Sequence, residues 1–157
     1  MSDQFEFIGT SDKPALLAFS TPDWMEEART ALSELGYKVH TAATHGDFLV
    51  RFSQARYQVV VIEELFAAND ITENLTLQAV QKMPMTQRRH CTFVLFGDSF
   101  QTFTPMQAFQ QSVHAVINPS ELFLLKQLVE KTVADNNFFL NNYREAQARV
   151  LAGETRD

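Results

Sequence analysis

A run of four β-branched apolar residues, from Val59 to Ile62, constrains the fold of this chain more than any other feature. A half-exposed strand alternates apolar and polar side chains, whereas this run is apolar on both faces. It is typical of a central strand in a parallel sheet that helices cover on both sides. Its carboxyl end, where α/β folds place their sites, carries Glu63 and Glu64. Neighbouring strand residues point to opposite faces, so the two carboxylates are not expected to converge on one substrate.

Further apolar segments predict four more strands, at residues 15–19, 38–42, 92–96 and 114–117, the second of them at or near an edge of the sheet. Helices are predicted between the strands, over residues 21–36, 44–55, 74–83, 104–113 and from 120 to about 151. In the first of these helices Thr21 is the expected N-cap, with Pro22 at the first helical position. Alternating strands and helices predict one α/β domain of three layers, with a doubly wound, flavodoxin-like five-stranded parallel sheet.

Composition excludes several classes of function. The formal charge of −6 and the scattered basic residues disfavour nucleic-acid binding, and Arg88-Arg89-His90 is expected to be a solvated tip. No apolar run reaches the roughly 20 residues that span a bilayer, so a cytoplasmic protein is expected. The single cysteine, Cys91, opens an apolar run and is expected to be buried and inert. The histidines lack metal-ligand spacing, so we expect surface positions, no metal and no cofactor: His40, His45, His90 and His114.

The order and lengths of these elements, with Leu35-Gly36-Tyr37-Lys38-Val39 after the first helix, resemble the receiver domains of bacterial response regulators. The resemblance extends over residues 13–133 and implies the strand order 2-1-3-4-5. Residues 1–12 then form a flexible lead, residues 134–152 a helical extension and residues 153–157 a tail.

The resemblance also implies where a receiver would carry its working residues, and each of these positions has changed. Glu63 takes the place of the phosphoacceptor aspartate, Phe19 and Ser20 of the two Mg²⁺-binding acids, Gly97 of the serine or threonine, Asn118 of the lysine and Ala115 of the switch aromatic. Pro119 is kept, which implies a cis bond before it. Mg²⁺ prefers carboxylate oxygens, and without it or the lysine nothing neutralises a transferring phosphoryl group. The chain thus resembles a pseudo-receiver that is not an enzyme.

Within this altered pocket, Glu63 is expected to be a solvated carboxylate, with Glu64 at the rim. A glutamate also places negative charge one methylene further out than aspartate, as a phosphoaspartate would. We rank that mimicry lower, because Gly97 and Ala115 cannot respond to the charge as a hydroxyl and an aromatic ring do in receivers.

Two aromatic segments suggest protein contacts. In receivers the fourth helix, fifth strand and fifth helix form the usual partner face, and here that face includes Phe103, Met106 and Ala115. The alternative, that Phe100 or Phe103 folds back over the end of the sheet, stays open, while Phe109 is assigned to the core.

The second segment lies beyond the end of a receiver fold. Its apolar residues continue a nearly heptad stripe that begins on the final helix, and the segment includes Phe138, Phe139, Leu140 and Tyr143. A second copy of the chain or another protein is favoured to cover them, over folding back after a break at Asn136-Asn137.

These observations predict a phosphorylation-independent protein-interaction module in bacterial signalling, with an unidentified signalling protein as partner and a homodimer through the C-terminal helix as one possibility. The alternative is a small-ligand-binding or enzymatic flavodoxin-like domain that uses the carboxyl edge of the sheet. A filled edge favours the interaction module, and an open cavity favours the alternative.

Overall fold

The computed structural model describes residue 9 and residues 11–152 of the 157-residue chain. Five parallel strands form one sheet in the order β2-β1-β3-β4-β5, as predicted: β1 (Lys13–Ala18), β2 (Tyr37–Ala42), β3 (Val59–Glu63), β4 (Thr92–Phe96) and β5 (Ala115–Ile117). The predicted tail at 153–157 and all of the predicted lead except residues 9, 11 and 12 lie outside the described residues.

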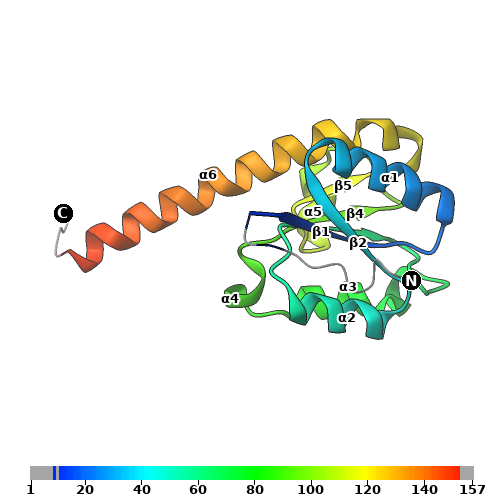
Figure 1. Cartoon of the computed structure of the whole chain (residues 1–157), viewed down its shortest axis with the longest axis horizontal. Helices are drawn as coiled ribbons and strands as arrows, with labels where there is room; N and C mark the ends of the chain where they lie inside the picture. The colour runs from blue at the N-terminus through cyan, green and yellow to red at the C-terminus, as the bar shows by residue number, and fades with distance from the viewer. Residues whose placement is uncertain (1–8, 10, 153–157) are drawn as a thin grey trace.

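Helices flank the sheet on both faces (Figure 1). The five predicted helices appear as α1 (Pro22–Glu34), α2 (His45–Gln54), α3 (Leu75–Lys82), α5 (Pro105–Gln110) and α6 (Leu125–Leu151). Two short elements of the described chain were not predicted: α4 (Met85–Arg88) and the 3₁₀ turn η2 (Ile71–Glu73). The beginning of the predicted last helix is instead a separate 3₁₀ element, η3 (Pro119–Leu124). Pro84 ends α3 as expected, but the chain then turns directly into α4.

The central strand separates two apolar cores. Val59 and Val61 face the core that α1 and α6 cover, whereas Val60 and Ile62 face the core beneath α2, α3 and α5. All four side chains are fully buried, which confirms the two-sided apolar strand predicted from the sequence.

The start of α1 departs from the prediction in one respect. Thr21 occupies the N-cap and Pro22 the first helical position, but the Thr21 hydroxyl makes no capping hydrogen bond to its own helix. It donates instead to Glu63 across the sheet edge. By contrast, Thr44 and Asn74 cap α2 and α3 in the usual way, accepting from Asp47 N and Leu77 N.

Several side chains lie differently from what we expected. Phe109 is 79% exposed, because the short helix α5 directs the smaller Ala108 into the core instead. His40 is buried, with its Nδ1 2.8 Å from the hydroxyl of Tyr57. The described residues contain no cis peptide bond, so the bond before Pro119 is trans. Cys91 is buried as predicted, and this burial raises the pKa of its thiol.

The last helix is continuous through Asn136-Asn137, so the break considered above is absent. It leaves the domain as a long projection (Figure 1). Its first turns pack on the sheet through Leu125, Leu128 and Val129. Among the described residues, no helix is both long and apolar enough to cross a membrane.

Candidate functional site

The Glu63 carboxylate occupies the position of a receiver's phosphoacceptor, at the carboxyl end of β3. Its Oε1 accepts hydrogen bonds from Ser20 N at 2.8 Å and Thr21 N at 3.0 Å, and its Oε2 accepts from the Thr21 hydroxyl at 2.9 Å. The residue is only 5% exposed, which corrects the expectation of a solvated carboxylate. Because Ser20 and Thr21 begin α1, the carboxylate also lies at the positive end of that helix.

Glu64 points to the opposite side of the strand, as the alternation of strand residues predicts. Its carboxylate accepts hydrogen bonds from the backbone N–H and the hydroxyl of Ser99, in the loop after β4. It is 8% exposed and therefore buried, not at a solvated rim. A Cβ on Gly97 would overlap with Oε1 and Cβ of Glu64, so the absence of a side chain at Gly97 makes room for this glutamate.

The remaining residues of this edge are also engaged within the domain. Phe19, at a metal-binding position of receivers, is buried, and its ring packs 5.3 Å from that of Phe96. The Ser20 hydroxyl accepts from Ala67 N at 2.7 Å. Asn118, which precedes Pro119 and occupies the lysine position, donates from Nδ2 to Phe100 O at 2.8 Å. Its Oδ1 accepts from Ser120 N.

A residue that the sequence analysis did not single out joins the two glutamates. Asn74 is fully buried, and its Nδ2 donates to the carbonyl oxygens of Glu63 at 3.0 Å and Glu64 at 3.1 Å. The carboxyl edge is therefore a closed network in which the polar groups satisfy one another. Among the described residues, no group of three or more His, Cys, Asp or Glu side chains could hold a metal ion.

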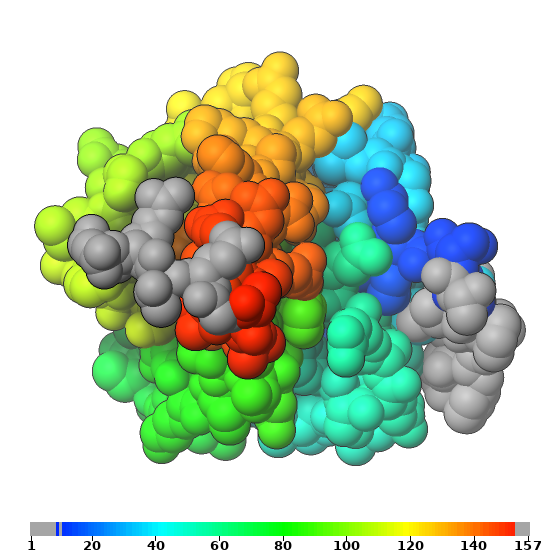
Figure 2. Space-filling view, turned by 90° about the vertical axis from the view of Figure 1, so that its left-hand side faces the viewer, coloured from blue at the N-terminus to red at the C-terminus, as the bar shows by residue number. Residues whose placement is uncertain are grey.

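A large surface hollow lies away from this network. It has a volume of about 1350 Å³ and runs along the open edge of β5 between α5 and α6, and we call it the α5–α6 groove. The exposed side chains that line it include Met85, Phe103, Phe109 and Phe139. Ala115 contributes to its floor, whereas Met106 is exposed on α5 outside the residues that line it. In Figure 2, α6 comes toward the viewer beside the yellow-green segment that contains α5.

Phe103 at the margin of this groove has an unusual backbone. Its φ is +64°, a left-handed conformation that bulky residues rarely adopt, while its N–H donates to Val116 O of β5. The alternative in which an aromatic folds back over the sheet is realised by Phe100, which is buried, while Phe103 stays half exposed.

The projecting part of α6 carries the other exposed aromatics. Phe138, Phe139 and Tyr143 are exposed, but Leu140 is only 8% exposed. Leu140 lines the α5–α6 groove together with Met85 and Arg88 of α4, so this domain itself covers one of the four side chains that we expected to be uncovered.

The basic tip, Arg88-Arg89-His90, makes more contacts within the domain than the solvated tip that we predicted. The guanidinium of Arg88 donates to Val80 O at 2.8 Å and to Ser112 O, and it lies 5.0 Å from the centre of the Phe93 ring. Nearby, His114 Nδ1 accepts from Phe93 N at 2.9 Å. His114 as a whole residue is exposed, but its ring is stacked on Phe93. Desolvation of the ring, and secondarily the charge of Arg88, lower the pKa of His114 to about 4.

The sequence matches no protein-family model and no curated protein. Solved structures do match its fold. CheY4, a chemotaxis response regulator of Vibrio cholerae, is 16% identical, with a TM-score of 0.57 over 78% of this chain and 99% of the other. A putative response regulator from Chloroflexus aurantiacus is 15% identical, with a TM-score of 0.64 over 79% and 99%.

The match to NtrX from Brucella abortus extends further along this chain. NtrX is 14% identical, with a TM-score of 0.64, and the match covers 92% of this chain but 30% of the longer NtrX chain. These likenesses, together with the strand order and the long final helix, establish the architecture predicted above. The chain has the fold of the response-regulator receiver domains.

Proposed function

We propose that this chain is a pseudo-receiver, a phosphorylation-independent protein-interaction module of bacterial signalling. The observation that carries the proposal is the closed network at the carboxyl edge. Glu63 and Glu64 each accept hydrogen bonds from groups of the same domain, and Phe19 directs an aromatic ring into the core where a receiver has an acid. An acceptor held in this way, with no metal-binding acids beside it, is poorly suited to attack a phosphoryl donor.

The partner surface in this proposal is the α5–α6 groove with the exposed aromatics of α6. Large exposed apolar side chains of this kind are typical of contact surfaces. The left-handed backbone of Phe103 is a second indication, because strained residues that the fold maintains cluster at functional positions. The alternative, a ligand-binding or enzymatic domain that uses the carboxyl edge, is less favoured, because the polar groups of that edge are already engaged.

A second copy of the chain is one candidate partner. On the projecting part of α6, Phe139, Tyr143 and Val150 recur at intervals of four and seven residues and are all exposed. Two such stripes would bury one another about a two-fold axis. The earlier part of the predicted stripe is not available for this contact, because Leu125 and Val129 pack on the sheet of their own domain.

Intact-mass measurement after incubation with Mg²⁺ and acetyl phosphate tests the first part of the proposal. We expect no change in mass, while a receiver that keeps its acid pair and lysine should gain one phosphoryl group under the same conditions. A stoichiometric phosphoryl gain that maps to Glu63 or Glu64 would refute the pseudo-receiver assignment.

Light scattering of the full chain tests self-association. We expect a dimer that the double substitution Tyr143→Glu, Val150→Glu dissociates, because it places charge in the apolar stripe. Asn141→Glu, on the opposite side of the same helix, is the matched control and should leave the dimer intact. A monomeric wild-type chain would exclude the homodimer and leave a different protein as the occupant of this surface.

A further inference from the structure

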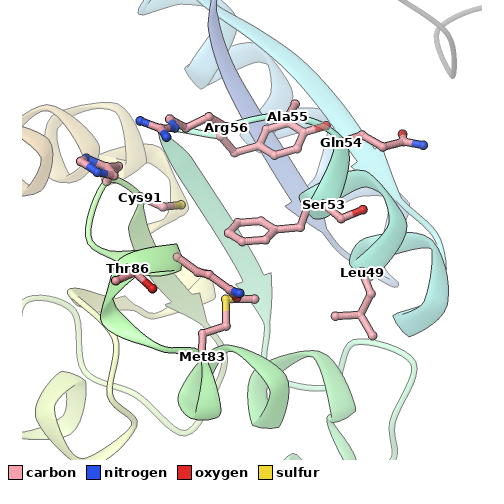
Figure 3. A pocket seen from close by; sticks show the side chains of 12 residues that line it. Leu49, Ser53, Gln54, Ala55, Arg56, Met83, Thr86 and Cys91 are labelled. Atoms are coloured by element: carbon pink, nitrogen blue, oxygen red, sulfur yellow. The ribbon is translucent and has the colours of Figure 1, made fainter.

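A second hollow lies at the amino edge of the sheet, opposite the glutamate network. It has a volume of about 660 Å³, within the range of roughly 300–1,000 Å³ that small-molecule sites occupy. The end of α2 and the segment after α3 form its two sides. Figure 3 shows Leu49 and Ser53 on one side of the hollow, and Met83, Thr86 and the thiol of Cys91 on the other.

One wall of this hollow is aromatic. The ring of Phe52 is stacked on Tyr57 with an interplanar angle of 18° and on Phe48 with an angle of 11°. Tyr57 and Phe48 are buried, whereas Phe52 itself is partly open to solvent. A flat, supported ring of this kind suits contact with a planar apolar group.

The mouth of the hollow is positively charged. Arg56 and His90 line it, and none of its twelve lining residues is an aspartate or glutamate. Arg89 and Arg144 also lie near His90. The pKa of His90 is lowered by burial first, and then by the charges of Arg56, Arg144 and Arg89. A chain with a formal charge of −6 thus gathers three arginines around one histidine.

Among residues 9 and 11–152, no carboxylate forms an ion pair with any of these three guanidinium groups. The ion pairs in the described part of the chain involve other cations: Arg29, Lys38, Arg51, Lys126 and Lys131. Within that part of the chain, Arg89 Nε is buried and has no hydrogen-bond partner. Arg89 itself lines the α5–α6 groove, whereas Arg56 is exposed at the mouth of the hollow. An exposed arginine without an acceptor is suited to an external carboxylate or phosphate.

We propose that this hollow binds a small organic anion, with a planar apolar ring against Phe52 and a carboxylate or phosphate held by Arg56 and His90. Arg89 and Arg144 do not line the hollow but add positive charge near His90. Binding is reversible and non-covalent, because the buried Cys91 thiol, with its raised pKa, is not a nucleophile. The inference does not depend on the protein-interaction role proposed above, since Phe52, Arg56 and His90 do not line the α5–α6 groove.

Two probes carry the shared chemistry from different sources: indole-3-acetate is an aromatic carboxylate, and AMP is an aromatic phosphate. Each is titrated into the ¹⁵N-labelled full-length chain, with indole-3-acetamide and adenosine as uncharged counterparts. We expect at least one anion to shift the amide signals of Phe52, Tyr57 and Cys91 saturably, with a Kd below about 1 mM. Its uncharged counterpart should bind about tenfold more weakly, because the ion contact is missing.

Substitutions locate the site. Arg56→Gln should weaken binding of the anion about tenfold, and because Arg56 is exposed, the variant should melt like the wild type. Arg149→Gln removes an exposed charge from the far part of α6 and is the matched control, with binding unchanged. Three outcomes would each overturn the proposal: equal affinity for charged and uncharged probes, shifts confined to the α5–α6 groove, or no saturable shift with either anion up to about 10 mM.

Discussion

The two edges of the sheet treat their charged side chains in opposite ways. At the carboxyl edge, two buried carboxylates accept hydrogen bonds from backbone N–H groups and hydroxyls of neighbouring loops. At the amino edge, Arg56, Arg89 and Arg144 surround His90 without an acidic partner among the described residues. The first arrangement holds the domain together, whereas the second leaves charge available to another molecule.

This difference suggests that the carboxyl edge contributes to stability and the amino edge to binding. In receivers the carboxyl edge is the reactive one, so a glutamate there invites a catalytic interpretation. The hydrogen bonds of that glutamate indicate a structural role instead. The arginines at the amino edge, by contrast, have no acidic partner among the described residues. Substitutions at the two edges should therefore have different consequences, and the following predictions compare them in order of decreasing effect.

The largest effect should come from Val60→Asp in the strand that supports both edges. Val60 is fully buried, and an unpaired carboxylate there costs several kcal/mol against a total stability of roughly 5–15 kcal/mol. We expect a largely unfolded chain by circular dichroism. Gln58→Asp, at an exposed position just before the strand, is the control and should melt close to the wild type. A folded Val60→Asp variant would contradict the central position of β3.

Glu63→Ala tests the difference between the edges directly. It removes the acceptor of two backbone N–H groups and one hydroxyl, so we expect a loss of about 2–4 kcal/mol in the free energy of unfolding. Arg56→Ala at the amino edge should change that free energy by less than about 0.5 kcal/mol. Urea denaturation measures both free energies, and equal losses for Glu63→Ala and Arg56→Ala would contradict the different roles of the two edges.

Gly97→Ala probes the space that Glu64 occupies. The new Cβ would overlap with the Glu64 side chain, including its Cβ, and we expect a loss of about 1–3 kcal/mol. Gly46→Ala is the control, because the atom nearest to its added Cβ is 4.0 Å away and alanine favours the helix by up to about 1 kcal/mol. If Gly97→Ala is as stable as Gly46→Ala, Glu64 is not fixed against Gly97.

The smallest effect concerns pH. The folded-state pKa of His114, about 4, lies below its ordinary value of 6.5, so between these values the unfolded chain binds more protons. The His114 contribution to stability is complete above pH 6.5 and is lost as pH falls toward 4. Because the residue is partly exposed, we expect about 1 kcal/mol at most. His114→Asn keeps an acceptor for Phe93 N and should flatten this part of the stability profile relative to the wild type.

The fold was predictable from local patterns. The run from Val59 to Ile62 requires burial on both faces, and the prolines and capping residues placed the helix ends within a few residues. The opposite directions of Glu63 and Glu64 followed from strand geometry alone.

The burial of these glutamates was not predictable in the same way. Their donors, Ser20, Thr21 and Ser99, are 35 to 43 residues away along the chain, and no local pattern connects them. Phe109 was misplaced because a helix of six residues is too short for its period to distinguish it from Ala108. The arginines at the amino edge converge from three separate segments, so their clustering appears only in the folded chain.

The continuity of α6 has a consequence for orientation. A helix of 27 residues is about 40 Å long, and each residue adds about 1.5 Å and 100° of rotation. Leu125 and Val129 pack on the sheet and fix the rotation of the helix about its axis. They therefore determine the direction, around that axis, in which Tyr143 and Val150 point at the far end. One residue inserted after Leu140 would turn that end by about 100°, whereas seven would nearly restore its phase. The length of the helix therefore fixes the orientation, relative to the domain, of any molecule that binds at its far end.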